Sequence, residues 1–297
     1  MVPTIPALHP ILTLVDASTG NILFGGVDVK KYKGDMTRIN VYREDQTDPT
    51  SNFTSFLVAM TSLQAFSPSG SDKLTSREFP IPVVLDSGTT LSYLPTKLAS
   101  QIWKEVGAVW SPEIEMAVLP CKMKTSKGFF SFGFAGPSGP KINVTMDELV
   151  LDLTTGPAPT FTSGQYRGQD VCEFGIQNFS SSPFLLGDTF LRSAYVVYDL
   201  VNNEIGIAPT DFNSTTTNIV AFPSSGATIP SSTPAPNQNQ VGQGLSDDTP
   251  PGFAAQAGFT GSASLAASLP AALDLPKMVV MVAAVGISII WSGAVSW

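Results

Sequence analysis

The chain has 297 residues, of which 43% are hydrophobic and only 13% are charged, so it contains enough apolar sequence for a substantial core. Its formal net charge is −8 and its isoelectric point is near 4.6. Because this acidic balance repels nucleic acid and no run of Lys or Arg offsets it, we exclude nucleic-acid binding.

The first residues of the chain do not match a secretory signal peptide. Residues 1–6 have no basic region, no uninterrupted apolar run and no small-residue cleavage site. The single histidine, His9, follows in the same Pro-rich stretch, and we interpret it as incidental. One histidine does not build a zinc site of the usual Cys/His kind, so we expect neither a metal nor a cofactor.

Residues 1–211 alternate short apolar runs with turns rich in Gly, Asp, Asn and Pro, which predicts a mainly β domain. A helix is predicted over 96–106, because Pro95 suits its start and Leu98 and Ile102 fall on one face. The predicted strands are 22–24, 81–85, 195–198 and 205–208.

One polar motif follows a buried strand directly. The apolar run before Asp86 ends there, and Ser87, Gly88, Thr89 and Thr90 come next. A carboxylate at the end of a buried strand is costly unless it accepts hydrogen bonds, which the hydroxyls of Ser87 and Thr89 could donate. Gly88 would let the backbone pass close by. Taken alone, however, Asp-Ser-Gly favours an ordinary turn, since all three residues are common in turns.

The two cysteines, Cys121 and Cys172, have no metal-ligand spacing. In a chain with several N-glycosylation sequons they favour a single disulfide formed in an oxidising compartment. The sequons begin at Asn52, Asn143, Asn178 and Asn213. Together they favour secretion, which conflicts with the first residues of the chain.

The composition changes after the β domain. Residues 212–277 are rich in Ser, Thr, Pro, Gly, Ala and Asn, which predicts a disordered, O-glycosylated stalk. Residues 278–297 carry no charge and are long enough to span a bilayer, but no basic residues follow them. Small residues at 261–264 and a short spacer precede this hydrophobic tail. We therefore expect a glycosylphosphatidylinositol-anchor signal, with a retained transmembrane helix as the alternative.

Several ordered sequence blocks make residues 16–209 resemble the C-terminal lobe of the pepsin family of aspartic proteases, and more narrowly its fungal, yapsin-type anchored members. The resemblance implies the C-terminal lobe of the pepsin-like double-ψ β-barrel fold and an aspartic-type endopeptidase. Cys121 and Cys172 fall where the family places its C-lobe disulfide. The blocks are 20–28, 31–34, the motif at Asp86, 93–95, 184–192, 195–199 and 205–208.

The resemblance also implies a role for each residue of the motif. Asp86 corresponds to the second catalytic aspartate. Ser87 matches the hydroxyl residue that cross-links the two lobes beneath the site. Gly88 would offer its amide near the carboxylate, and Thr89 would donate a hydrogen bond to its outer oxygen. Thr90 would line the substrate cleft.

The family's chemistry needs a second carboxylate. Two carboxyl groups held close share one proton, so that one activates a water while the other assists the scissile carbonyl. The first lobe supplies the other aspartate in an Asp-Thr-Gly or Asp-Ser-Gly motif, together with a tyrosine on a flap. We find neither here, since the triplets at Asp72 and Asp188 lack the glycine. We therefore expect Met1 to be a truncated start, with an N-terminal lobe encoded upstream.

Three functional interpretations remain open. The chain is the C-terminal part of a surface-anchored acid endopeptidase, or a one-lobe, non-catalytic surface or cell-wall module, or a homodimeric protease that uses Asp86 twice. In the first case the partners are peptide or protein substrates, the missing lobe and a membrane to which the C-terminal anchor attaches the protein. The expected location is the cell surface or cell wall.

Overall fold

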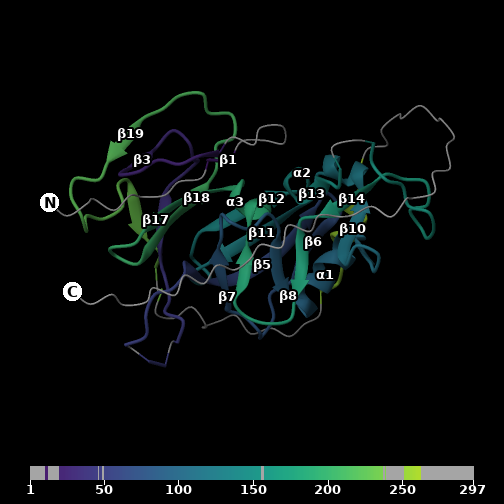
Figure 1. Cartoon of the computed structure of the whole chain (residues 1–297), viewed down its shortest axis with the longest axis horizontal. Helices are drawn as coiled ribbons and strands as arrows, with labels where there is room; N and C mark the ends of the chain where they lie inside the picture. Colours follow the sequence, from purple (N-terminus) through teal and green to yellow (C-terminus); the bar gives the residue numbers. More distant parts are fainter. Residues whose placement is uncertain are drawn as a thin grey trace, which may run out of the picture. The chain divides into compact units, whose positions relative to one another are not determined.

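The fold is mainly β, as predicted, whereas the double-ψ β-barrel arrangement stays a prediction. The computed structural model describes residues 11–12, 20–45, 47–48, 50–154, 157–236, 238 and 251–261. Within this part the strands form five sheets, accompanied by short helices (Figure 1). The predicted hydrophobic tail lies outside the described residues. No helix in the described ranges is long and apolar enough to cross a membrane.

The largest sheet interleaves strands that are distant in the sequence. Its order is β12-β11-β5-β7-β16-β8-β15, with β6 paired to β5. Strand β16 therefore separates β7 from β8; it is parallel to β7, with Leu186 opposite Leu85, and antiparallel to β8. The strands are β5 (Leu57–Ser67), β6 (Gly70–Lys73), β7 (Ile81–Leu85), β8 (Ser92–Pro95), β11 (Phe129–Phe134), β12 (Lys141–Thr145), β15 (Ile176–Phe179) and β16 (Phe184–Leu186).

The other four sheets of the described part have two or four strands each. One sheet has the order β17-β18-β4-β20, formed by Ala194–Asp199, Glu204–Pro209, Met36–Asn40 and Ser232–Pro234. Another has the order β13-β14-β10-β9, formed by Val150–Asp152, Val171–Phe174, Met116–Pro120 and Val109–Ser111. The two-stranded pairs are β1 (Ile11–Leu12) with β2 (Gly20–Asn21) and β3 (Gly26–Asp28) with β19 (Ile219–Ala221).

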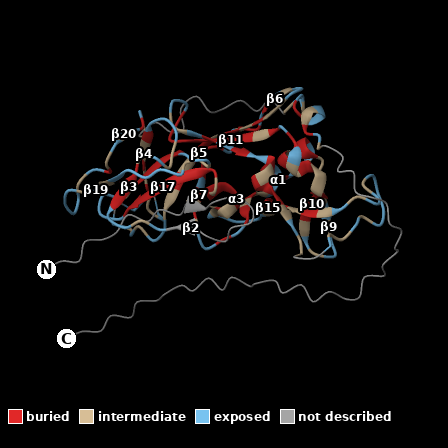
Figure 2. Ribbon diagram, turned by 90° about the horizontal axis from the view of Figure 1, so that it is seen from above, coloured by how far each residue is buried: buried red, intermediate tan, exposed pale blue. Residues whose placement is uncertain are grey.

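The helices are short apart from one. Helix α1 (Thr96–Val106) has the predicted bounds, buries Leu98 and Ile102, and ends at Gly107, whose φ of 71° is the left-handed conformation that favours glycine. The others are α2 (Met146–Leu149), α3 (Asp188–Leu191) and the 3₁₀ helices η1 (Cys121–Thr125) and η3 (Gln256–Gly258). Strands β3, β17 and β19 lie at one end of the described part and α1 and β10 at the other (Figures 1 and 2).

Two apolar clusters hold these sheets together. The larger cluster contains three phenylalanines of β11, of which Phe132 packs edge-on against Phe190 with ring centroids 5.3 Å apart. The smaller cluster joins β3, β4 and β17 through Val27, Met36 and Tyr195. The buried residues are red in Figure 2, and β17 is buried along its whole length. Strand β7, which leads to Asp86, contributes three residues to the larger cluster.

Most of the predicted strands are confirmed. The strand predicted at 81–85 is β7, and those at 195–198 and 205–208 lie within β17 and β18. The strand predicted at 22–24 is wrong, because β19 pairs with residues 26–28 instead. Ile22 and Phe24 are exposed in the preceding segment, so apolar side chains alone did not specify a strand there.

Residues 212–236 differ from the disordered stalk that their composition predicts. Strand β19 pairs with β3, and β20 pairs in parallel with β4. Ile229 is buried in the smaller cluster, and the Arg38 side chain donates a hydrogen bond to the Ser232 carbonyl at 3.1 Å. Backbone pairing and a few apolar side chains order a segment with little hydrophobic sequence. The domain limits at 211 and 277 stay predictions.

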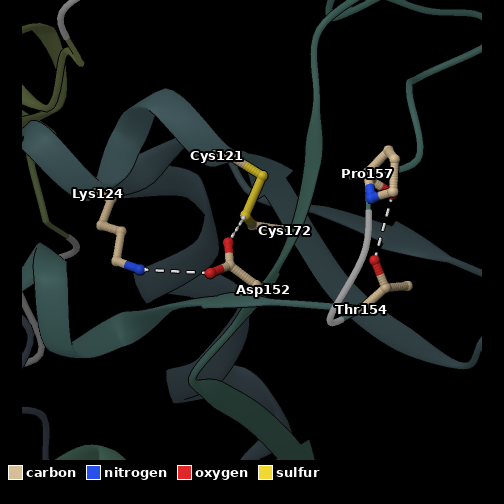
Figure 3. The surroundings of a disulfide bond; sticks show 6 residues. All are labelled: Cys121, Lys124, Asp152, Thr154, Pro157 and Cys172. Carbon is tan, nitrogen blue, oxygen red and sulfur yellow. Dashed lines mark hydrogen bonds and ion pairs between the residues drawn. A yellow bond between two sulfur atoms is a disulfide. The ribbon is translucent and has the colours of Figure 1, made fainter. Parts of the chain in front are cut away.

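A disulfide joins two segments that are far apart in the sequence. Cys121 at the start of η1 is bonded to Cys172 on β14, with a sequence separation of 51 (Figure 3). The Asp152 carboxylate lies beside the bond, 3.5 Å from Cys172 Sγ, and is 3.6 Å from the Lys124 amine. Since both sulfurs are in the disulfide, neither is available as a thiolate ligand for a metal.

Removing this disulfide should lower the free energy of unfolding by about 3 kcal/mol, because a closed loop of this length restricts the unfolded chain strongly. The variant is the double substitution Cys121→Ala with Cys172→Ala, and the measurement is urea unfolding of the full chain. Unfolding the unaltered protein in reductant is the control and should show the same loss. A loss below about 1 kcal/mol in both experiments would contradict the prediction.

Candidate active site

The carboxylate of Asp86 is held at the end of β7 by the residues that follow it. The Gly88 amide donates a hydrogen bond to Asp86 Oδ1 at 2.9 Å, and the Thr89 hydroxyl donates one to Oδ2 at 2.5 Å. The Asp86 amide in turn donates to the Leu186 carbonyl on β16 at 3.0 Å. Each carboxylate oxygen therefore has one donor, and the group has a fixed orientation.

The predicted motif residues come together in this loop but differ in exposure. Asp86 is partly exposed, and Thr89 is buried beneath it. Ser87, Gly88 and Thr90 are exposed. A Cβ at Gly88 would lie 3.2 Å from Asp86 Oδ1, so a side chain there would crowd the carboxylate. The family roles of Ser87 and Thr90, contact with the other lobe and with substrate, stay predictions.

The chain after β16 supports the loop from below. The Asp188 amide donates to the Thr89 carbonyl at 2.8 Å, and the Thr189 amide donates to the Thr90 carbonyl at 3.1 Å. Gly187 lies directly against the loop, because a Cβ there would be 2.2 Å from the Thr89 carbonyl oxygen. The loop that presents Asp86 is thus tied to the start of α3.

Three supporting side chains were not predicted from the sequence. The hydroxyls of Ser92 and Thr189 are 3.1 Å apart and buried, and Thr189 also donates to the Gly175 carbonyl at 3.0 Å. The Tyr198 hydroxyl donates to the Leu85 carbonyl, one residue before Asp86, at 3.3 Å. Only Tyr198 gave a signal in the sequence, since a tyrosine in an otherwise apolar strand needs a partner for its hydroxyl.

Burial dominates the electrostatics around Asp86. It raises the pKa of Tyr198, and the charges of Asp86 and Asp188 raise it further, so the phenol stays neutral. Burial also raises the pKa of Asp188; Arg192 opposes this and Asp86 adds to it. Asp188 therefore senses the charge of Asp86. The hydrogen bonds to the Asp86 carboxylate nevertheless come from Gly88 and Thr89.

Three of the four predicted glycosylation sites are exposed. Asn52, Asn143 and Asn213 are exposed, and Asn178 at the end of β15 is half-buried. Asn178 lines an open pocket of about 360 Å³ together with Trp110 and other residues. Exposure is necessary for modification but does not establish it, so the four sites stay predictions.

A carboxylate fixed by a glycine amide and a threonine hydroxyl, on a loop backed by an inserted strand, is the arrangement of an aspartyl protease lobe. The family model "Eukaryotic aspartyl protease" matches residues 11–210, and the chain belongs to this family. The match covers the whole of the sheet that carries Asp86.

Three curated relatives come from fungi and are named as an aspartic endopeptidase or an aspartic proteinase. "Probable aspartic-type endopeptidase OPSB" of Arthroderma benhamiae is 40% identical over 275 residues, covering 92% of this chain and 53% of the relative. "Aspartic proteinase 3" of Saccharomyces cerevisiae is 37% identical over 223 residues, covering 74% of this chain and 35% of the relative. "Aspartic proteinase yapsin-3" of the same yeast is 29% identical, covering 75% and 40%. The chain thus spans about half or less of the length of these relatives.

Proposed function

We propose that this chain supplies the carboxyl-terminal lobe, and one of the two catalytic carboxylates, of an aspartic endopeptidase. The observation that carries the proposal is the geometry at Asp86, whose two oxygens accept hydrogen bonds from Gly88 and Thr89 at the exposed end of a buried strand. A carboxylate held in this way, with one side open, is prepared to meet a partner carboxyl group and a water.

The reaction divides the work between two carboxyl groups. The ionised group takes a proton from a water, which attacks the carbonyl carbon of the peptide bond. The protonated group donates a hydrogen bond to the carbonyl oxygen as that oxygen gains negative charge. Asp86 is one of the pair, and Gly88 and Thr89 keep its oxygens pointed at the reacting atoms. The whole reaction needs a second aspartate in addition to Asp86.

Exposed apolar side chains support a partner lobe. Ile22, Phe24 and Ile219 are each more than half exposed, and they lie on or next to the β3–β19 pair. Large apolar side chains grouped on a surface are typical of an interface. We propose that a lobe carrying the second aspartate covers this surface and contacts Ser87. A one-lobe module without catalysis and a homodimer that uses Asp86 twice are the alternatives.

We further propose that the protein works outside the cell, at the surface or in the wall. The disulfide between Cys121 and Cys172 supports an oxidising compartment. The four sequons and the small share of charged residues, 13%, agree with this location. A lipid anchor near the carboxyl terminus, predicted from residues 278–297, would hold the enzyme at the membrane.

The test is to assay peptide cleavage at acidic pH with the full chain alone and after co-expression with the amino-terminal half of the Arthroderma benhamiae relative. Pepstatin-sensitive cleavage is expected only when both halves are present. Cleavage by the chain alone would support the homodimer instead. If both halves form a complex that cleaves nothing, the catalytic proposal is wrong and the inert module is favoured.

A further inference from the structure

A short segment near the carboxyl-terminal end of the described residues lies against the lobe, on the surface formed by α1, β11 and the β5–β6 hairpin. The Phe259 side chain is only 5% exposed, and its ring stacks on Phe130 of β11 with centroids 5.4 Å apart. Gly128 makes room for it, because a Cβ at this position would lie 2.2 Å from the Phe259 ring. The Lys104 amine lies 3.8 Å from the centre of the Phe253 ring.

The backbone of the same segment is bonded in a defined register. The hydroxyls of Ser69 and Ser67 donate to the carbonyls of Ala254 and Ala255, at 2.7 and 2.6 Å. The Ala255 amide donates to Asp72 Oδ2 at 2.7 Å. The Gln256 side chain adds a bond of 2.6 Å to the Lys104 carbonyl. Anchoring by both an aromatic ring and several backbone bonds makes this a specific contact.

A pair of buried carboxyl groups lies beneath this contact. Glu105 of α1 is 0% exposed, and neither of its side-chain oxygens has a donor among the described residues. Asp72 of β6, which is 6% exposed, faces Glu105 and is also the acceptor for the Ala255 amide. Two carboxylates cannot hydrogen-bond to each other unless one of them carries a proton.

We propose that residues 251–261 form a clasp that closes on the lobe in acid, when protonated Glu105 donates a hydrogen bond to Asp72, and opens toward neutral pH, when Glu105 loses that proton. In the closed state Glu105 donates to Asp72, and Asp72 keeps its bond from the Ala255 amide. Loss of the proton leaves two buried negative charges side by side. Asp72 must then move away from Glu105, and this breaks the bond that holds the clasp.

The charges around the pair agree with this direction. Burial raises the pKa of Glu105 from 4.5 to about 7, and the negative charge of Asp72 adds to this effect, whereas the charge of Lys104 opposes it. Residues 251–261 carry no ionisable side chain, so the clasp itself does not titrate. The closed state holds the proton more tightly than the open state. The contribution of this proton to the stability of the closed state is therefore fully present below about pH 4.5. It is lost as the pH rises to about 7.

Hydrogen exchange of the full chain between pH 5 and pH 8 tests the proposal, with rates corrected for the intrinsic pH dependence of exchange. The protection of amides in 253–259 should fall by roughly tens of fold between pH 5 and pH 7 and then level off. Glu105→Gln, which donates to Asp72 without titrating, should keep the clasp protected at pH 8. Glu113→Gln, the same change at an exposed site, should behave like the unaltered protein.

A second variant keeps the test decisive. Phe259→Ala should lower the protection of the clasp amides at every pH, while the amides of β17 stay protected. This result would show that exchange in 253–259 reports the contact between the clasp and the lobe. Protection of 253–259 that does not change with pH would overturn the proposal. The same holds if Glu105→Gln loses protection as the unaltered chain does, or if β17 loses protection together with the clasp.

Discussion

Asp86→Asn should lower kcat for peptide hydrolysis by about 1,000-fold or more in the two-lobed protease. Asparagine is close in shape and can still accept a bond from the Gly88 amide, so the fold should persist. Its amide does not carry or accept the shared proton, so the acid–base work of the pair is lost. The measurement is steady-state cleavage of a peptide at acidic pH by the complex of both halves.

The matched control is Asp35→Asn, the same change at an exposed aspartate that is not part of the catalytic loop. This control should keep kcat within about twofold of the value for the unaltered complex, because surface substitutions far from the reacting atoms have small effects. If Asp86→Asn keeps more than about a tenth of the activity, Asp86 is not one of the catalytic carboxylates. Activity retained by Asp86→Asn would refute the proposed function, even if the two halves still associate.

Gly187→Ala should destabilise the lobe by at least about 4 kcal/mol, enough to prevent folding of a marginal domain. The new Cβ would lie 2.2 Å from the Thr89 carbonyl oxygen and 2.4 Å from that of Leu91. Both are backbone atoms of the catalytic loop, so relief requires the loop and β16 to separate. Urea unfolding, or the yield of soluble protein, measures the effect.

Gly34→Ala separates this steric effect from the general cost of replacing a glycine. Gly34 has a φ of +72° and nothing within 4 Å of a built Cβ, so its substitution carries only the cost of the left-handed backbone, about 1 kcal/mol. Similar losses for the two variants would show that the loop tolerates a side chain at Gly187. The inference that Gly187 packs too closely against the catalytic loop to carry a side chain would then be wrong.

The sequence predicted best those elements that depend on local pattern. Helix α1 has the predicted bounds because Pro95 and the apolar face at Leu98 and Ile102 act within a few turns. Strand β7 was recognisable as an uninterrupted apolar run that ends at a polar motif. The structure brings Gly88 and Thr89 into hydrogen-bond contact with the Asp86 carboxylate, and the roles of these residues in catalysis stay predictions.

What the sequence did not predict depends on contacts between distant segments. The composition of residues 212–236 gave no sign that β19 and β20 would pair with β3 and β4, since backbone bonds leave no hydrophobic pattern. The clasp contacts the lobe through two phenylalanines in a segment otherwise poor in large side chains. Glu105 lies within the predicted helix, but its burial beside Asp72 comes from the tertiary fold.

The insertion of β16 between β7 and β8 also affects the order in which the protein can fold during synthesis. A ribosome that has released the chain only as far as β15 has produced Asp86 and its motif, but not Leu186 or the start of α3, to which the loop is bonded. Contacts between such distant residues form slowly and late. The nascent chain is therefore expected to hold Asp86 in an unsupported loop until nearly the whole lobe has emerged, so the catalytic loop forms only when the lobe is almost complete.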